Sequence, residues 1–186
     1  MSVGADDRAL IARAAQGDAQ AFAELVRRHQ GWVRRLAFRY TRQGQDAEEL
    51  AQEIFLRAWR HARSFRGEAA FATWLYRLAV NACLNFRAGR RARPEPLPLS
   101  EELESGAPAV GAGISAAERE ARLRQALASL PARQRLALVL ASFEDKSYEE
   151  IAAAMGTSLS SVESLLFRAR RGLAAALRPF REKGEI

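Results

Sequence analysis

The stretch from Pro94 to Ala117 limits what this chain can fold into, because it cannot form a long helix or strand. A proline removes a backbone amide and a glycine adds backbone freedom, so several of each prevent regular structure. The stretch holds Pro94, Pro96, Pro98, Pro108, Gly106, Gly111 and Gly113. It also carries four glutamates and no basic residue. We therefore predict a flexible acidic linker over residues 94–117, with one folded part on either side.

Both folded parts are predicted to be helical. Apolar residues recur at helical spacing through them, and no run alternates as a strand does. Gly17-Asp18 ends one helix and caps the next, and Asp46 opens another. The expected buried stripes are Ala47, Leu50, Ala51, Ile54 and Ala58 in one helix and Phe71, Leu75, Leu78 and Ala82 in the next. The sequence thus predicts an all-α protein of two small helical domains, residues 1–93 and 118–186.

The charge of the chain favours an anionic partner. Its 186 residues carry a formal net charge of +7, with an isoelectric point of about 10.6. Such a balance suits nucleic acid or an acidic membrane surface. Lys146 and Lys183 are the only lysines, and arginine suits bidentate contacts to phosphate and guanine. GC-rich coding also favours arginine, so both explanations of this bias remain open.

Several classes of protein are disfavoured by what the sequence lacks. Cys83 is the only cysteine, so neither an internal disulfide nor a zinc cluster is expected. The amino terminus lacks an apolar signal core, and no apolar run is long enough to span a bilayer. His29 and His61 lack metal-ligand spacing, and we assign Cys83 to packing. We expect a cytoplasmic protein that is not an enzyme and needs no cofactor or metal.

The most specific local pattern is "KSYEEIAAAMGTSLSSVESLLFRARRGL" in the carboxyl-terminal part. Ser147 and Glu150 fit a capping box, Gly156 supplies a turn, and Ser158 caps the next helix. That helix sets an apolar stripe opposite a small-polar, aromatic and basic face, which suits a DNA major groove. An ordinary amphipathic helix would also have a basic side. The capped first helix and the glycine turn favour a helix-turn-helix.

The stretch "DAEELAQEIFLRAWRHARSF" predicts a helix with a second apolar face. Phe55, Leu56 and Trp59 project away from the buried stripe, between acidic residues. Such a helix is either buried on both sides or binds a partner. We favour burial for Phe55. We favour a partner surface for Glu49, Gln52 and Trp59, because acidic groups do not belong in a core.

Five stretches together resemble the extracytoplasmic-function (ECF) sigma factors, a group of bacterial RNA polymerase subunits. They are "QGDAQAFAELV", "DAEELAQEIFLRAW", "SFRGEAAFATWLYRLAVN", "SLPARQRLALVLASFEDKSYEEIAAAMG" and "SVESLLFRARRGL". The likeness covers nearly the whole chain. It implies that residues 1–93 are sigma region 2, which binds the polymerase clamp and the −10 promoter element. It implies that residues 118–186 are sigma region 4, which binds the −35 element.

The resemblance also implies a function and its partners. The chain would be an alternative sigma factor that binds core RNA polymerase and directs promoter recognition, DNA melting and transcription initiation for a stress or envelope regulon. Its partners would be core polymerase, promoter DNA and a cognate anti-sigma factor. The linker would run near the RNA path, where an acidic chain could mimic nucleic acid; an inert tether remains the alternative.

Three sets of site residues follow from this resemblance. The polymerase set is Asp46, Glu48, Glu49, Gln52, Glu53, Leu56 and Trp59. The −10 set is Ser64, Phe65, Arg66, Gly67, Thr73, Trp74, Arg77, Asn81, Asn85, Arg87, Arg90 and Arg91. The −35 set is Ser160, Ser161, Glu163, Ser164, Phe167, Arg168 and Arg171.

Within the −10 set, the loop "SFRGEAAF" would hold a flipped base, because aromatic faces capture bases that leave the stack. Gly67 would let the loop turn and Arg66 would meet a phosphate. Phe65 and Phe71 would shape the packing around the base. Trp74 fits burial and DNA contact equally.

The −35 set departs from the family in one respect. Glu163 and Leu165 stand where a basic residue is common, which leaves the −35 sequence open. Glutamate can accept a hydrogen bond from cytosine N4, so Glu163 is a candidate for specificity.

Two other functional classes remain as alternatives. A stand-alone helix-turn-helix regulator would bind its site without polymerase. A decoy sigma would bind polymerase or an anti-sigma factor without initiating transcription.

Overall fold

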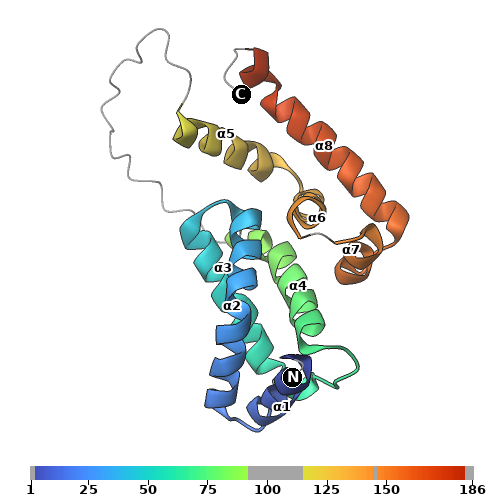
Figure 1. The fold of residues 1–186 in the computed structure, drawn as a ribbon. Helices are drawn as coiled ribbons and strands as arrows, with labels where there is room; N and C mark the ends of the chain where they lie inside the picture. Colours follow the sequence, from blue (N-terminus) through green and yellow to red (C-terminus); the bar gives the residue numbers. More distant parts are fainter. Residues whose placement is uncertain (1–2, 92–114, 145, 183–186) are drawn as a thin grey trace.

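The computed structural model of this chain describes residues 3–91, 115–144 and 146–182, and within them every regular element is a helix (Figure 1). The elements are α1 (Val3–Ala14), α2 (Ala19–Thr41), α3 (Gly44–Arg60), the 3-10 turn η1 (Ala62–Ser64), α4 (Phe71–Arg91), α5 (Ala116–Ser129), α6 (Ala132–Phe143), α7 (Tyr148–Met155) and α8 (Leu159–Glu182). The predicted all-α class is confirmed. Most of the predicted linker lies outside the described residues, and α5 begins at Ala116 rather than near Glu118.

The break between α1 and α2 forms where Gly17-Asp18 predicts it. Gly17 has a φ of +96°, a left-handed conformation that glycine adopts without strain. The Asp18 carboxylate then accepts hydrogen bonds from the amides of Gln20 and Ala21, each at 3.0 Å. These amides and the nearby Arg13 hold the pKa of Asp18 below its usual value. This cap starts the longest helix of the amino-terminal half.

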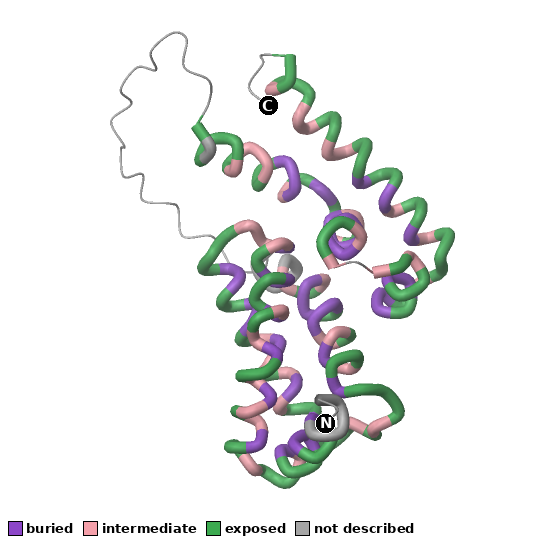
Figure 2. The backbone as a smooth tube through the Cα atoms, in the orientation of Figure 1, coloured by how far each residue is buried: buried purple, intermediate pink, exposed green. Residues whose placement is uncertain are grey.

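The amino-terminal half is a bundle in which α2 packs against α1 and α3, and α4 closes the other side. The predicted stripe of α3 is buried throughout, from Ala47 to Ala58. On α4, Phe71, Leu75 and Ala82 are buried as predicted. Leu78, which we also expected in the buried stripe, is only half-buried, and Ala79 at the next position of the helix is buried instead. Figure 2 shows buried bands recurring along the helices of this bundle.

A buried polar group ties α1 to α2. The ring of His29 places Nε2 2.8 Å from Oδ2 of Asp7, and both residues are buried. On the other side of the ring, the indole of Trp32 donates a hydrogen bond to His29 Nδ1 at 3.2 Å. Since Nδ1 accepts from Trp32, the arrangement suits an imidazole whose proton is on Nε2 and is donated to Asp7. This link fixes α1 beside the start of α4, because the His29 ring also packs against Phe71.

The carboxyl-terminal half contains the predicted helix-turn-helix. Ser147 and Glu150 form a reciprocal capping box at the start of α7. Gly156 ends α7 with a φ of +59°, and Ser158 accepts a hydrogen bond from the amide of Ser161 at 3.2 Å. A second capping box, Ser115 with Glu118, starts α5. The hydrogen bonds from Ser115 hold the pKa of Glu118 below its usual value.

The two halves are in contact, which the sequence did not indicate. Helices α6 and α7 pack against α4, and α6 also packs against α2 (Figure 1). The guanidinium of Arg135 lies 4.0 Å from the centroid of the Tyr40 ring, and both residues are buried. Arg42, which ends α2, pairs with Glu120 of α5 at 2.7 Å. Most buried apolar residues of α6–α8 form one cluster with those of the amino-terminal half, while Leu138 and Ala169 join Leu127 and Leu130 in a second, smaller cluster.

Candidate polymerase and nucleic-acid interfaces

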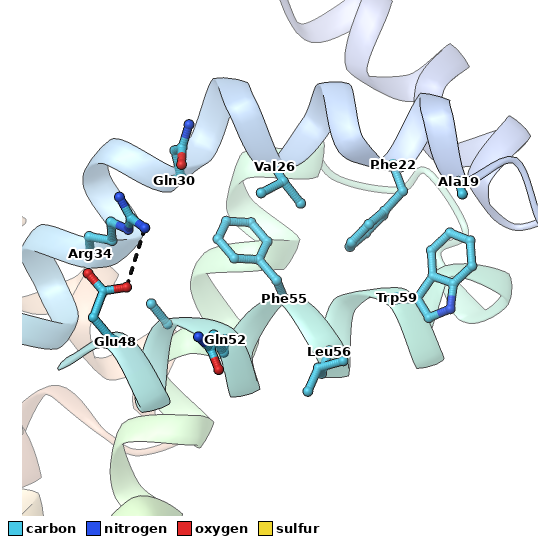
Figure 3. A pocket seen from close by; sticks show the side chains of 11 residues that line it. Ala19, Phe22, Val26, Gln30, Arg34, Glu48, Gln52, Phe55, Leu56 and Trp59 are labelled. Carbon is cyan, nitrogen blue, oxygen red and sulfur yellow. Dashed lines mark hydrogen bonds and ion pairs between the residues drawn. The ribbon is translucent and has the colours of Figure 1, made fainter. Parts of the chain in front are cut away.

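An apolar groove with a volume of about 520 Å³ runs between α2 and α3, and we call it the α2–α3 groove (Figure 3). It is lined by Ala19, Phe22, Val26, Gln30, Arg34, Glu48, Ala51, Gln52, Phe55, Leu56 and Trp59. The ring of Phe22 meets Trp59 edge to face, with centroids 5.0 Å apart. Leu56 remains 48% exposed at the groove. A groove of this kind, apolar and open to solvent, suits the side chains of a protein partner.

One end of the α2–α3 groove is charged. Arg34 of α2 pairs with Glu48 of α3 at 3.3 Å (Figure 3). Glu49 and Gln52 are exposed on α3, and Glu53 pairs with Arg57 one turn further along at 2.6 Å. The groove lining thus holds one carboxylate and one guanidinium, and the other two glutamates lie on α3 outside the lining.

Of the predicted polymerase set, Glu48, Gln52, Leu56 and Trp59 line the α2–α3 groove, whereas Glu49 and Glu53 lie on α3 outside its lining. Asp46 is buried, so its carboxylate is not displayed on the surface as we expected. Asp46 also does not open the helix as we predicted, because α3 begins at Gly44 after Gln43, which makes no side-chain cap. Asp46 lies in the first turn, where an acidic side chain is stabilised by the helix amides. Phe55, which we expected to be buried, is half-buried and lines the α2–α3 groove.

The predicted −10 loop, residues 64–71, leads from η1 into α4, and its last residue, Phe71, is the first residue of that helix, so the loop itself spans residues 64–70. Gly67 has a φ of +71°, so the turn there needs a residue that tolerates the left-handed region. Three aromatic rings pack together where the loop joins α4. The ring centroid of Phe65 lies 6.1 Å from that of Phe71 and 5.4 Å from that of Trp74. The centroids of Phe71 and Trp74 are 5.8 Å apart. Phe71 is buried as expected, whereas Phe65 and Trp74 are half-buried and keep part of their surface open.

One face of α4 extends from this loop as a row of polar groups. Thr73, Arg77, Asn81 and Asn85 are spaced by four residues and are all exposed. Residues at this spacing lie along one side of a helix. Arg87, Arg90 and Arg91 belong to α4, but their side chains lie outside the described residues. Ser64 and Arg66, in the loop before α4, are also exposed.

The exposed face of α8 carries the predicted −35 set. Phe167 is 61% exposed, and the Arg171 guanidinium lies 5.6 Å from its ring centroid. Of the set, Ser160, Glu163, Ser164, Phe167, Arg168 and Arg171 are exposed. Ser161 is half-buried, and its hydroxyl lies 2.8 Å from that of Ser158. Ser161 therefore supports the start of α8 rather than standing free on its surface.

Comparison with known protein families shows which family these two helical halves belong to. Residues 25–93 match the model of sigma-70 region 2, and residues 120–173 match sigma-70 region 4. The chain belongs to the ECF sigma factors. It is 38% identical to the ECF RNA polymerase sigma-E factor of Escherichia coli, over 96% of this chain and 98% of that one. It is 37% identical to the RNA polymerase sigma-H factor of Pseudomonas aeruginosa, over 93% and 94% of the two chains. It is thus an alternative sigma factor that directs transcription initiation.

Solved structures share the fold of this sigma factor. The structure of CnrH in complex with the cytosolic domain of CnrY is 29% identical, with a TM-score of 0.63 over 94% of this chain and 98% of that one. A Bartonella quintana sigma factor, RpoE, solved in complex with the anti-sigma factor NepR, shares the fold at 24% identity and a TM-score of 0.57, over 86% and 98% of the two chains. In the described part of the sigma factor, no helix has the length and apolar character needed to cross a bilayer.

Sequence reasoning missed one wall of the α2–α3 groove. Phe22, Val26, Gln30 and Arg34 line it from α2, and we assigned them no role at the polymerase surface. Their spacing by four residues marks a second row on α2, beside the buried row that includes Leu25. That second row was the available signal for an apolar face left open in this sigma factor.

Cys83 is a packing residue in this sigma factor. It is buried in α4, and burial raises the pKa of its thiol to about 12. A thiol with such a pKa forms little nucleophilic thiolate at neutral pH.

Proposed function

We propose that the α2–α3 groove is the surface through which this sigma factor binds core polymerase. The observation that supports this most is an apolar groove, open to solvent, along a helix that carries Glu48, Glu49 and Glu53 on an otherwise basic protein. A partner that fits it offers apolar side chains flanked by basic groups, because opposite charges favour docking. We propose the polymerase clamp as that partner.

We propose that the 64–70 loop and α4 bind the −10 element as it melts. The half-buried rings of Phe65 and Trp74 offer surface on which an unstacked base could rest. Arg77, Asn81 and Asn85 extend this surface with exposed donors along α4. Arg87, Arg90 and Arg91 are proposed to hold backbone phosphates.

We propose that α8 enters the major groove of the −35 element. The first turns of such a helix approach base edges, while later turns approach the backbone. Ser164, Phe167 and Arg168 are therefore proposed to contact bases or thymine methyl groups. Arg171, one turn later, is proposed to hold phosphate.

We propose that the functional domains follow the limits expected from the sequence: region 2 over residues 1–93, a linker over 94–117 and region 4 over 118–186. The protein acts in the cytoplasm, where the polymerase is, and has no enzymatic activity of its own. A cognate anti-sigma factor is its further partner. The likeness to CnrH, which was solved with the cytosolic domain of CnrY, supports a protein partner of this kind.

Charge reversal on α3 tests the polymerase surface. Glu49→Lys with Gln52→Lys places two positive groups beside the α2–α3 groove, and we expect binding to core polymerase to be lost. Both residues are exposed, so the helical content and melting temperature should stay near those of the parent protein. Gln125→Lys with Glu182→Lys makes the same charge change at exposed positions of the carboxyl-terminal half and serves as the control. Normal core binding by the α3 variant would show that the proposed surface is wrong.

A further inference from the structure

A second hollow lies between α1, η1 and the −10 loop. Its volume is about 140 Å³. Ile11 and Ala62, both buried, form its apolar floor, and Phe65 forms a wall. Arg8, Arg63 and Arg66 also line it, and we call it the arginine hollow. Figure 1 shows α1 beside the loop that leads into α4.

The three arginines line the arginine hollow, and no ion pair of theirs is found among the described residues. Arg63 donates from Nε to the carbonyl oxygen of Ala15 at 3.1 Å, which fixes its guanidinium at the edge. Like charges around one small hollow repel each other and create a positive field that an anion would relieve.

Arg8 touches the turn of the −10 loop. A Cβ atom placed on Gly67 would lie 2.6 Å from Nη2 of Arg8, so this guanidinium lies directly against the loop backbone. Gly67 therefore serves two needs, the left-handed turn and the close approach of Arg8. Arg8 belongs to α1, before the residues that match region 2.

The position of Arg8 does not depend on the loop alone. Asp7, the preceding residue, is buried against His29, and this contact fixes α1 on the bundle. Arg8 itself is exposed, so its charge is available to a ligand while its backbone is held in place. The hollow thus combines positioned guanidinium groups with an apolar floor and an aromatic wall, a combination that suits a nucleotide with its phosphate at the rim.

We infer that Arg8, with Arg63 and Arg66, binds a phosphodiester of the −10 strand beside the base that the loop captures. This inference rests on the proposed function of the −10 loop and adds α1 to the promoter interface. Guanidinium groups match phosphate oxygens in a bidentate manner, so each contact positions the strand without reading its sequence. The strand would pass over the arginine hollow as it leaves the duplex.

The test uses holoenzyme on a promoter fragment from which the parent sigma factor directs run-off transcription, with the −10 element left unpaired. Arg8→Gln should weaken binding about tenfold, since it removes a charge-assisted contact. The slope of log affinity against log salt should fall by about 0.7 for this lost contact to a single strand. Arg13→Gln removes the same charge from α1 but breaks only an exposed pair with Asp18, so its effect should stay within about twofold.

Neutral methylphosphonate linkages identify the phosphate. Replacing the −10 phosphodiesters of the non-template strand one at a time should weaken the parent holoenzyme at one or two positions. At those positions Arg8→Gln should lose nothing more, because the contact is already gone. The inference fails if Arg8→Gln binds as tightly as the parent. It also fails if the affinity lost through Arg8→Gln and the affinity lost through the methylphosphonate add at every position, because Arg8 then does not hold any of these phosphates. Failure to find any promoter fragment from which the parent protein directs run-off transcription would instead refute the proposed function.

Discussion

Arg39 and Glu144 form an ion pair across the two halves of the molecule, with Nη1 of Arg39 2.6 Å from Oε1 of Glu144. Arg39 lies in the last turn of α2, and Glu144 ends α6. Both side chains are less than one-third exposed. Beside this pair, the Arg39 guanidinium lies 5.3 Å from the ring centroid of Phe143. The pair therefore joins the half that carries the −10 loop to the half that carries α8.

Reversing one member of this pair should loosen the contact between the halves. Arg39→Glu sets two carboxylates against each other, and we expect it to weaken the contact by about 1 kcal/mol. Small-angle X-ray scattering of the free protein should then show a larger radius of gyration. The exchange Arg39→Glu with Glu144→Arg should restore the parent value. An unchanged radius in the single variant would show that the pair does not hold the halves together.

Side chains at the −10 loop should matter more for DNA opening than for the first binding step. Trp74→Ala and Asn81→Ala remove a ring and an amide from the proposed path of the melted strand. Loss of stacking costs about 1–3 kcal/mol per base, so opening should slow strongly. Permanganate reactivity of unpaired thymines measures opening directly, and a mobility shift measures the closed complex.

Trp74 also packs against Phe65 and Phe71, so its loss could act through the fold. Trp74→Phe keeps an aromatic ring and serves as the control, with thermal unfolding measured for both variants. If Trp74→Ala and Asn81→Ala both show the same permanganate reactivity as the parent, neither residue takes part in DNA opening. Trp74 would then serve only packing, and Asn81 would be an ordinary surface residue.

Glu163 should determine one base of the −35 element. It is exposed on α8, one residue before Ser164 on the face that we propose enters the major groove. If its carboxylate accepts from a cytosine amino group, Glu163→Lys should change the preferred base at one position. Selection from randomised −35 elements with holoenzyme gives this preference. A variant that binds every sequence more tightly and with a steeper salt dependence, at unchanged preference, would show that Glu163 only tempers the charge.

The capping box of α7 should make the helix-turn-helix sensitive to acid. Hydrogen bonds from Ser147, and then Lys146, hold the pKa of Glu150 below its usual value. The unfolded chain lacks these bonds, so their stabilisation is present above the ordinary glutamate pKa and is lost as the pH falls through the lower folded value. Glu150→Ala should thus be less stable than the parent in urea at pH 7, and this difference should shrink in acid. A difference that is independent of pH would contradict this role of the carboxylate.

Local features of the fold could be predicted because neighbouring residues determine them. The spacing of Leu50 and Ile54 marks a buried stripe wherever that helix packs, and Ser147 with Glu150 caps a helix whatever lies around it. The exposed face of α8 followed from the same periodicity. Such signals lie within one or two helical turns, so they are visible in the sequence.

Relations between distant segments could not be predicted in this way. Arg135 covers Tyr40, and Arg8 meets Gly67, although nothing in either local sequence indicates its partner. Asp46 is an acidic residue near the start of α3, as the exposed Glu48 and Glu49 are, yet the packing of α3 buries it. The α2 wall of the α2–α3 groove was missed for the same reason, since an open groove depends on how two helices meet.

Run-off transcription tests the central claim, that this chain recruits core polymerase and opens promoters, most directly. Core polymerase, genomic promoter fragments and the protein are combined, and transcripts are compared with those from core alone. We predict discrete transcripts that require the protein and disappear with Glu49→Lys and Gln52→Lys. Binding to core without any transcript would mark a decoy. Tight sequence-specific DNA binding without core, again with no transcript, would mark a stand-alone regulator, and either result would contradict the account.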